Sequence, residues 1–427
     1  MPASTIYAVD ITPPEHALTG RITLPGSKSI TNRALLVAAL SQGESRLTGG
    51  LGSDDTRHMA TALRAMGVGI EQDGTTFSVS SRGRLDVPAA PLFLGNAGTA
   101  MRFLTAACAF MDGHVVLDGD EHMRKRPIAP LVAALRGLGL DLAAPSGCPP
   151  VEIFGRPDAL AGEGMRTVEI DGSLSSQYVS ALLMAAPSAP VPVLVRVTGK
   201  EIGSRGYIDI TLAVMRAFGA SVSQQDKLAW RVEPTGYTAT DYAIEPDASA
   251  ATYLWAAEKL TGGRIDIGVR PADMNQPDAR AHELIATFPK MPVRIAGEQI
   301  QDSIPTLAVM AIFNETPVRF TGLANLRVKE TDRVSALSTE LNRILPGLAR
   351  QDGDDLIVNG SPAHSGQHLP AAITTYSDHR IAMSFALAGL RLKGIRILDP
   401  GCVAKTYPEY WRDLASLGLQ IAEVEAP

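Results

Sequence analysis

Cationic and hydroxyl side chains gather at the start of an apolar run in LPGSKSITNRALLVAAL, residues 24–40. Lys28, Ser29 and Arg33 lie near the beginning of the run, and Gly26 lets a ligand approach the backbone closely. The free N–H groups and the positive dipole end of a helix N-terminus favour anions. This stretch therefore predicts an anion-binding site at the beginning of a helix.

The spacing excludes the phosphate loop of nucleotide triphosphatases, which requires G-x-x-x-x-G-K-[ST]. Lys28 follows Ser27 instead of a glycine, and Arg21 or Ile22 stands where the first glycine would be. The predicted anion is therefore not a nucleotide triphosphate.

Five later apolar runs also begin with small or polar residues. Such residues could simply cap helices, which is the interpretation we favour for Asp247. Capping does not require a lysine or arginine beside the cap. For the cations near the helix starts we therefore favour ligand binding; these cations are Lys28, Arg33, Arg102 and Arg380. The five starts are Asn96 to Arg102, Ser173 to Gln177, Asp247, Asp302 and Ser377 to Arg380.

Two kinds of helix-like segment alternate along the chain. Amphipathic segments, most of which end at a glycine before a strand-like run, lie at 58–70, 131–142, 210–222, 281–295, 334–348 and 410–421. An alanine-rich segment with few charges precedes each, which predicts a helix buried on all sides. Any α/β protein contains some such junctions, but the repetition favours an α/β fold of two similar domains, each with three units and with buried helices surrounded by sheet.

Glycine or proline interrupts the pattern near residues 23–27 and 243–247, where we expect the chain to cross between domains. One domain then comprises residues 1–26 and 246–427 and contains both termini, and the other comprises 27–245. The helix starts come from both domains, so we expect the site in a cleft between them.

Composition excludes several classes of protein. The net charge is -6 without a basic tract, which argues against a nucleic-acid partner. No apolar run approaches the roughly 18 residues of a membrane helix, and the N-terminus lacks the features of a signal peptide, so we expect a cytoplasmic protein and no membrane. Cys108, Cys148 and Cys402 are far apart and the histidines show no ligand spacing, so we expect no disulfide and no metal.

Eight motifs occur in an order that resembles the 5-enolpyruvylshikimate-3-phosphate synthase family. They are LPGSKSITNRALL, SDDTRHM, LFLGNAGTAMR, DGSLSSQY, YIDITL, RVKETDR, SDHRIAM and CVAKTYPEYW, and they cover the chain from about residue 18 to 418. The resemblance implies an inside-out α/β barrel fold, in which each of two domains has three βαβαββ-like units. This agrees with the repeats found from the residues alone.

The resemblance also implies an activity: transfer of the enolpyruvyl group of phosphoenolpyruvate to the 5-hydroxyl of shikimate 3-phosphate, releasing phosphate through a tetrahedral intermediate. This step leads to chorismate and the aromatic amino acids, needs no cofactor and is the target of glyphosate. We expect the protein to act as a monomer on these two small-molecule substrates.

Carried over by motif, the phosphoenolpyruvate site comprises Lys28, Gly98, Arg126, Gln177, Arg333, Arg380 and Lys405. The shikimate 3-phosphate site comprises Lys28, Ser29, Arg33, Ser175, Ser176, Gln177, Ser204, Tyr207, Asp302, Asn325 and Lys329. Both substrates are polyanions, which explains why lysines and arginines are abundant in these motifs.

The resemblance also provides candidates for proton transfer. Asp302 is the candidate to deprotonate the 5-hydroxyl, and Glu330 or Lys329 to protonate C3 of phosphoenolpyruvate. Lys28 and the arginines would stabilise the charge of the departing phosphate. His379 is either a proton shuttle or a residue that orients Glu330.

Two segments leave alternatives open. Phe103 stands where the family commonly has proline, so we expect it to shift the helix start at Gly98 and to weaken glyphosate binding. In SDDTRHM, a structural ion-pair cluster of Asp54, Asp55 and Arg57 is favoured over a functional one.

Two alternative functions are less well supported by the sequence. UDP-N-acetylglucosamine enolpyruvyl transferases share the fold and chemistry, but they lack RVKETDR and commonly use a loop cysteine. A non-catalytic anion-binding module is disfavoured because Asp302 and Glu330 are both present.

Overall fold

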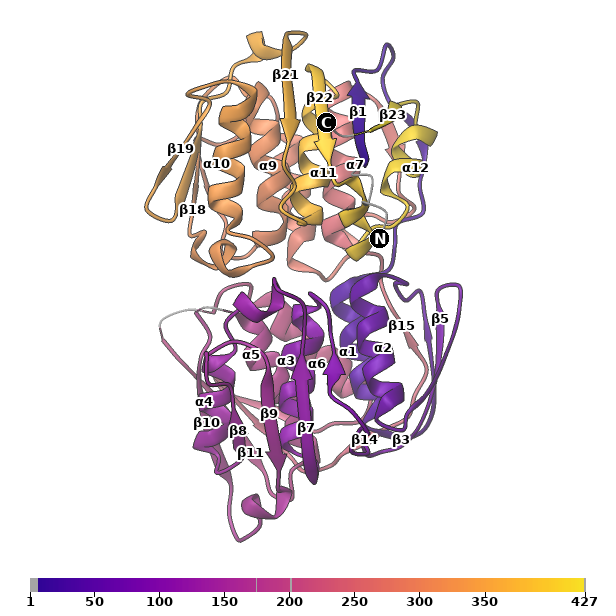
Figure 1. Ribbon diagram of the computed structural model, residues 1–427, viewed down its shortest axis with the longest axis vertical. Coiled ribbons are helices and arrows are strands. Elements are labelled where there is room, and N and C mark those ends of the chain that lie inside the picture. The colour runs from indigo at the N-terminus through magenta and orange to yellow at the C-terminus, as the bar shows by residue number, and fades with distance from the viewer. Residues whose placement is uncertain (1–6, 174, 200–201, 426–427) are drawn as a thin grey trace. The chain divides into compact units, whose positions relative to one another are not determined.

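The computed structural model describes residues 7–173, 175–199 and 202–425. The chain divides into two compact units, of which unit 1 comprises residues 1–25 and 246–427 and unit 2 comprises 26–245 (Figure 1). Gly26, which we expected in the first domain, falls in unit 2. An ideal Cβ on Gly26 would lie 1.9 Å from the carbonyl oxygen of Gly49, so its backbone is packed directly against this unit.

The described residues of unit 2 form three sheets and six main helices. The sheets have the orders β14-β3-β5-β4, with β15 also paired to β3, then β6-β7-β9-β8 and β10-β11-β13-β12. Their strands are β3 (Ser41–Thr48), β4 (Gly69–Asp73), β5 (Thr76–Arg82), β6 (Leu92–Phe93), β7 (Gly113–Asp118), β8 (Asp141–Ala143), β9 (Val151–Gly155), β10 (Arg166–Asp171), β11 (Val193–Thr198), β12 (Val222–Asp226), β13 (Ala229–Val232), β14 (Tyr237–Thr238) and β15 (Tyr242–Ala243). The helices are α1 (Lys28–Ala39), α2 (Asp54–Ala65), α3 (Gly98–Ala109), α4 (Ala129–Gly137), α5 (Ser176–Ala185) and α6 (Gly206–Ala217).

Unit 1 repeats this plan with one shorter sheet. The strand orders of its sheets are β21-β22-β1-β23 and β17-β18-β20-β19, and β16 and β2 form a parallel pair. The strands are β1 (Tyr7–Thr12), β2 (Thr19–Arg21), β16 (Arg264–Asp266), β17 (Arg294–Ala296), β18 (Val318–Thr321), β19 (Ala349–Asp352), β20 (Asp355–Val358), β21 (His368–Ile373), β22 (Lys393–Leu398) and β23 (Gln420–Glu425). The helices are α7 (Ala248–Thr261), α8 (Ala281–Ala286), α9 (Ile304–Met310), α10 (Arg333–Ile344), α11 (His379–Ala388) and α12 (Tyr410–Ser416).

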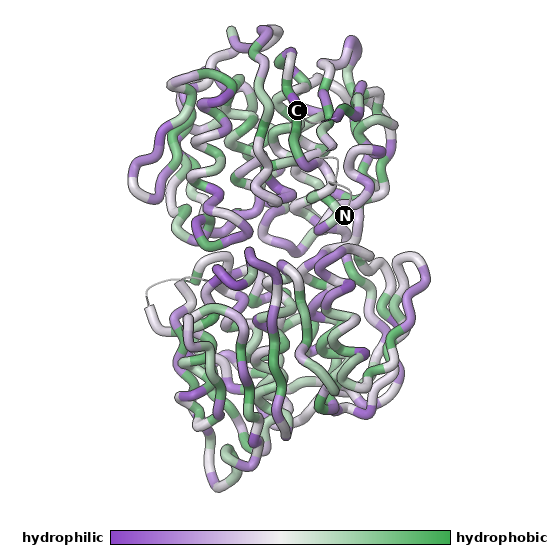
Figure 2. Tube along the Cα trace, in the orientation of Figure 1, coloured by the Kyte–Doolittle hydropathy of each residue, from purple (hydrophilic) through white to green (hydrophobic). Residues whose placement is uncertain are grey.

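The alanine-rich helices form the core of each unit, as the sequence predicted. Every residue of α3, α9 and α11 is buried, whereas α2 and α10 also have exposed residues, among them Arg57 of α2 and Arg343 of α10. Short alanine side chains let neighbouring helices approach closely, and the surrounding sheets cover them. Hydrophilic colour in Figure 2 lies largely in the connecting loops. Among the described strands, the sheets of each unit remain separate and do not merge into one continuous barrel.

The close packing at Gly26 gives a test of the unit boundary. Gly26→Ala should lower the free energy of unfolding by about 1–3 kcal/mol, because the new methyl group would overlap the Gly49 carbonyl oxygen. Gly137→Ala is the control, since a Cβ there meets nothing within 4 Å and Gly137 is the last residue of α4. Urea unfolding measures both; equal stability of the two variants would contradict the packing described.

Candidate functional site

In unit 2, the start of α1 is held by the start of α2. The Ser27 hydroxyl caps α1 by accepting from the Ile30 N–H at 3.4 Å. Lys28 Nζ lies 3.3 Å from Asp55 Oδ2, and these side chains are only 12% and 4% exposed. Partial desolvation strengthens this attraction, so Asp55 positions the Lys28 amine at the helix start.

The segment SDDTRHM therefore divides into two parts. Asp54 and Arg57 form an exposed ion pair of the kind that contributes little to stability. Asp55 instead faces Lys28 from inside the unit. Periodicity cannot reveal such a contact between helices.

Arg33 is buried among neutral partners. Its guanidinium donates to Thr211 Oγ1 at 2.7 Å, Ser29 O at 2.8 Å, Ser180 Oγ at 3.2 Å and Tyr207 O at 3.4 Å. It also lies 5.1 Å from the centre of the Phe103 ring and 5.8 Å from that of Tyr207. Burial lowers the pKa of Arg33 to about 10, which still leaves it charged at neutral pH.

Among the residues with described side chains, no carboxylate pairs with this buried cation. Cation–π contacts and neutral oxygens compensate part of the desolvation. The positive charge of Arg33 is therefore not neutralised by an acidic side chain in the described part of the chain.

Gly98, at the start of α3, has an arginine packed directly against it. An ideal Cβ on Gly98 would lie 2.6 Å from Arg126 Nη2, so any larger residue would displace the guanidinium. Arg126 is 7% exposed, and its Nη1 donates to Asn96 Oδ1 at 3.0 Å. Two of the predicted residues therefore meet at one helix start.

The starts of α3 and α5 are joined through Gln177. Its Oε1 accepts from Arg102 Nη1 at 2.5 Å, and its Nε2 lies 3.4 Å from Thr99 Oγ1. Ser175 caps α5 by accepting from the Gln177 N–H at 3.2 Å, and Ser176 follows, buried, as the first residue of the helix. Arg102, which we expected to bind a ligand, thus contacts a predicted ligand-binding residue.

Ser204 and Tyr207 form the turn that leads into α6. Ser204 is buried and has a left-handed backbone with φ of 54°, and its carbonyl oxygen accepts from the Tyr207 N–H at 3.1 Å. The Tyr207 ring lies against Arg33, so this turn adjoins the α1 start.

In unit 1, cations and carboxylates alternate around the starts of α10 and α11. Arg333 is 1% exposed and makes four hydrogen bonds, two to Asp378 and one each to Asp302 and Glu330. Arg380 Nη2 lies 3.0 Å from Asp302 Oδ2. Arg333 is therefore at the centre of the cluster, and Asp378 is a member that motif matching did not select.

Two lysines complete this cluster. Lys405 Nζ lies 3.3 Å from Glu330 Oε1, and Lys329 Nζ lies 3.8 Å from Asp302 Oδ1. Asn325 is buried in the short helix Ala324–Val328 that precedes Lys329. The unit 1 residues predicted to bind substrate thus lie on neighbouring elements.

Charge compensation keeps the two arginines protonated. Burial would lower the pKa of Arg333, but Asp378, Glu330 and Asp302 together raise it above its ordinary value. Burial likewise opposes the charge of Arg380, and Asp302 is the main group that raises its pKa. Both side chains are permanent cations that hold the carboxylates in place.

His379 and Asp247 occupy helix starts with different surroundings. The His379 side chain is fully buried, and its Nδ1 lies 3.7 Å from Asp378 Oδ1. The Asp247 carboxylate accepts from the Ala250 N–H at 2.9 Å, which confirms the predicted capping role.

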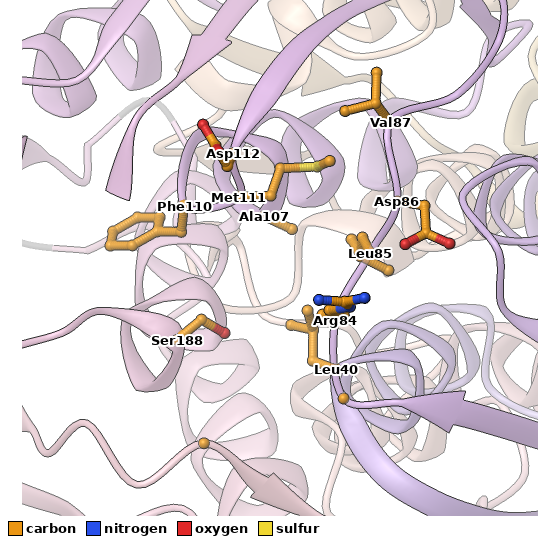
Figure 3. A pocket seen from close by; sticks show the side chains of 12 residues that line it. Leu40, Arg84, Leu85, Asp86, Val87, Ala107, Phe110, Met111, Asp112 and Ser188 are labelled. Atoms are coloured by element: carbon orange, nitrogen blue, oxygen red, sulfur yellow. The ribbon is translucent and has the colours of Figure 1, made fainter. Parts of the chain in front are cut away.

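A cavity in unit 2 lies at the ends of α1 and α3 opposite to their charged starts. It has a volume of about 560 Å³ and is lined by Leu40 and Phe110, which follow the last residues of α1 and α3 (Figure 3). Its lining, within the described residues, includes none of the predicted site residues. The charged helix starts, at the opposite ends of α1 and α3, are therefore the better candidate site.

None of the helices in the described ranges has the length and apolar character of a membrane span. In the same ranges, no group of three or more His, Cys, Asp or Glu residues could hold a metal ion.

Comparison with known sequences gives long matches. A family model described as EPSP synthase (3-phosphoshikimate 1-carboxyvinyltransferase) matches residues 12–414. The 3-phosphoshikimate 1-carboxyvinyltransferase of Rhizobium leguminosarum bv. trifolii is 63% identical over 410 residues, covering 96% of this chain and 97% of the relative. That of Pseudomonas syringae pv. syringae is 61% identical over 412 residues, covering 96% and 98%.

Comparison with solved structures identifies proteins with a similar fold. An EPSP synthase from Acinetobacter baumannii matches with a TM-score of 0.77 and 26% identity, over 98% of this chain and 100% of that one. The enolpyruvyl transferase NikO from Streptomyces tendae matches with a TM-score of 0.76 over 99% and 100%, and its 18% identity supports the fold alone. The predicted fold is thereby confirmed.

The contact between Phe103 and Arg33 can be measured without any substrate. In a double-mutant cycle of Phe103→Leu and Arg33→Met, we expect a coupling free energy of about 0.5–2 kcal/mol from urea unfolding, because leucine keeps bulk but lacks the ring quadrupole. The pair Phe103 and Arg82 is the control, since Arg82 lies on β5 and pairs with Asp86. Additive effects of Phe103→Leu and Arg33→Met would contradict the contact.

Proposed function

Because the chain belongs to the EPSP synthase (3-phosphoshikimate 1-carboxyvinyltransferase) family, we propose that it transfers the enolpyruvyl group of phosphoenolpyruvate to the 5-hydroxyl of shikimate 3-phosphate. The observation that carries this proposal is the presence of two cationic clusters, one at the helix starts of each unit, built from the residues that the family motifs select. We propose that the two units are the domains of the enzyme, which acts as a cytoplasmic monomer.

The two substrates are assigned to different sets of residues. Phosphoenolpyruvate would bind Lys28, Gly98, Arg126, Gln177, Arg333, Arg380 and Lys405. Shikimate 3-phosphate would bind Lys28, Ser29, Arg33, Ser175, Ser176, Gln177, Ser204, Tyr207, Asp302, Asn325 and Lys329. The buried charge of Arg33 supports an anion near the second set. Each set includes residues of both units, so we propose that the domains close when the substrates bind.

The chemistry needs one base and one acid during addition. The 5-hydroxyl oxygen attacks C2 of phosphoenolpyruvate while its proton passes to Asp302, which Arg333 and Arg380 hold in place. C3 becomes a methyl group by accepting a proton from Glu330 or Lys329. His379 is buried beside Asp378. We propose that it supports proton transfer from Glu330, either as a proton shuttle or as a group that orients the Glu330 side chain.

Elimination then reverses the change at C3. The methyl group returns a proton to the group that protonated C3, Glu330 or Lys329, as the bond from C2 to the phosphate oxygen breaks, and the double bond forms again. Lys28 and the arginines stabilise the negative charge of the departing phosphate.

The direct test is phosphate release that requires both substrates together. Release with the two substrates, and none with either alone, supports the proposal. Binding of both without release would indicate a non-catalytic anion-binding protein instead. Release that requires UDP-N-acetylglucosamine would identify the related transferase.

Two variants should separate anion binding from proton transfer. Lys28→Met should raise KM for phosphoenolpyruvate, because it removes the charge that Asp55 positions. Asp302→Ala should lower kcat by about 10²- to 10⁴-fold, because it removes the proposed base, while both substrates still bind. Steady-state kinetics and equilibrium binding measure the difference; Arg57→Met, which removes an exposed cation, is the control. An Asp302→Ala variant with unchanged kcat would reject its role as the base.

Phe103 should also affect inhibition by glyphosate. Its buried ring lies against Arg33, and a proline would lose that contact and alter α3 near Gly98. We expect Phe103→Pro to bind glyphosate more tightly with little change in kcat. Inhibition constants of glyphosate, measured against phosphoenolpyruvate, test this expectation. Equal constants for the unmodified protein and Phe103→Pro would contradict it.

A further inference from the structure

Two consecutive residues with left-handed backbone precede α11. Tyr376 has φ of 56° and Ser377 has φ of 52°. This conformation is unfavourable for residues that carry a Cβ, and a pair of them persists only where surrounding contacts hold it. The next residues, Asp378 to Arg380, belong to the cationic cluster of unit 1. The direction in which α11 begins therefore depends on whatever holds this turn.

The turn is held by a buried carboxylate on α10. The Glu340 side chain is fully buried, and it accepts from Tyr376 Oη at 2.7 Å and from the Thr374 N–H at 3.1 Å. Arg343 Nε donates to it at 2.6 Å and balances its charge. Hydrogen bonds to an ionised group are stronger than those between neutral groups. Glu340 thus binds both the backbone and the side chain of the segment that enters the turn.

Helix α10 holds the other end of the turn as well. Arg333, which lies two helical turns before Glu340, donates to the buried carboxylate of Asp378 at 2.8 Å. Asp378 caps α11 by accepting from the Arg380 N–H at 2.9 Å, and its own N–H donates to Thr375 O at 2.9 Å. The strained turn is therefore fixed between two contacts from one rigid helix.

We propose that Glu340 and Tyr376 are positioning residues for the phosphoenolpyruvate site. Their hydrogen bond keeps the turn left-handed. The conformation of the turn then determines the positions of His379 and Arg380 at the start of α11. The proposal rests on the proposed function, in which Arg380 binds phosphoenolpyruvate. Motif comparison selects neither Glu340 nor Tyr376.

The kinetic test uses Tyr376→Phe, which removes only the hydroxyl, and Glu340→Gln, which keeps the shape of the side chain. Each should raise KM for phosphoenolpyruvate about 5- to 10-fold while KM for shikimate 3-phosphate stays within about twofold. Tyr237→Phe is the matched control, because it loses a buried hydrogen bond of 2.8 Å to Met184 O in unit 2. It should lower Tm and leave both KM values unchanged.

A purely structural role would lower Tm in all three variants without the selective change in KM. Unchanged KM for phosphoenolpyruvate in both test variants, or equal increases for the two substrates, would overturn the proposal.

Hydrogen exchange provides a readout that does not need turnover. The amides of Asp378 and Arg380 should exchange at least about tenfold faster in Tyr376→Phe than in the unmodified protein, and should be unaffected in Tyr237→Phe. Unchanged exchange would overturn the proposal. Faster exchange in a protein whose unmodified form shows no turnover would support the role of the turn and reject the proposed function.

Discussion

Positive charge held out of water is the constraint on which this structure depends. Unit 1 balances Arg333 and Arg380 with Asp302, Glu330 and Asp378, so its cations are neutralised inside the protein. In unit 2, Arg33 has neutral oxygens and two aromatic rings instead. Charges of this kind are costly to bury unless they are paired, so each unit surrounds its buried arginines with hydrogen-bond acceptors, which are carboxylates in unit 1 and neutral oxygens in unit 2.

The scaffold meets this constraint by bringing helix starts together. Gln177 joins α3 to α5 through Arg102 and Thr99, and Arg33 joins α1 to Ser180 of α5 and Thr211 of α6. Such contacts require helices that approach closely, which small side chains allow. The sheets then cover apolar surfaces that the short helices could not bury alone. Close packing thereby fixes the positions of the charged groups.

The sequence allowed the α/β class, the buried helices and the helix starts to be predicted, because each depends on residues near one another in the chain. Lys28, Gly98 and Arg380 were found in this way. The side chains that these residues contact could not be predicted, because the contacts join elements that are far apart in the chain. Examples are Asp55 with Lys28, Phe103 with Arg33 and Glu340 with Tyr376. Their residue types resemble those of ordinary surface or core positions. The left-handed turn at Ser377 also has no signal in the sequence, because glycine is absent there.

We propose that shikimate 3-phosphate binds charged residues of both units and brings the units together. Small-angle X-ray scattering, with and without saturating shikimate 3-phosphate, can detect this domain closure. We expect a smaller radius of gyration with the ligand, and no such decrease in Arg33→Met, which lacks the buried charge. Identical scattering curves with and without bound shikimate 3-phosphate would contradict it.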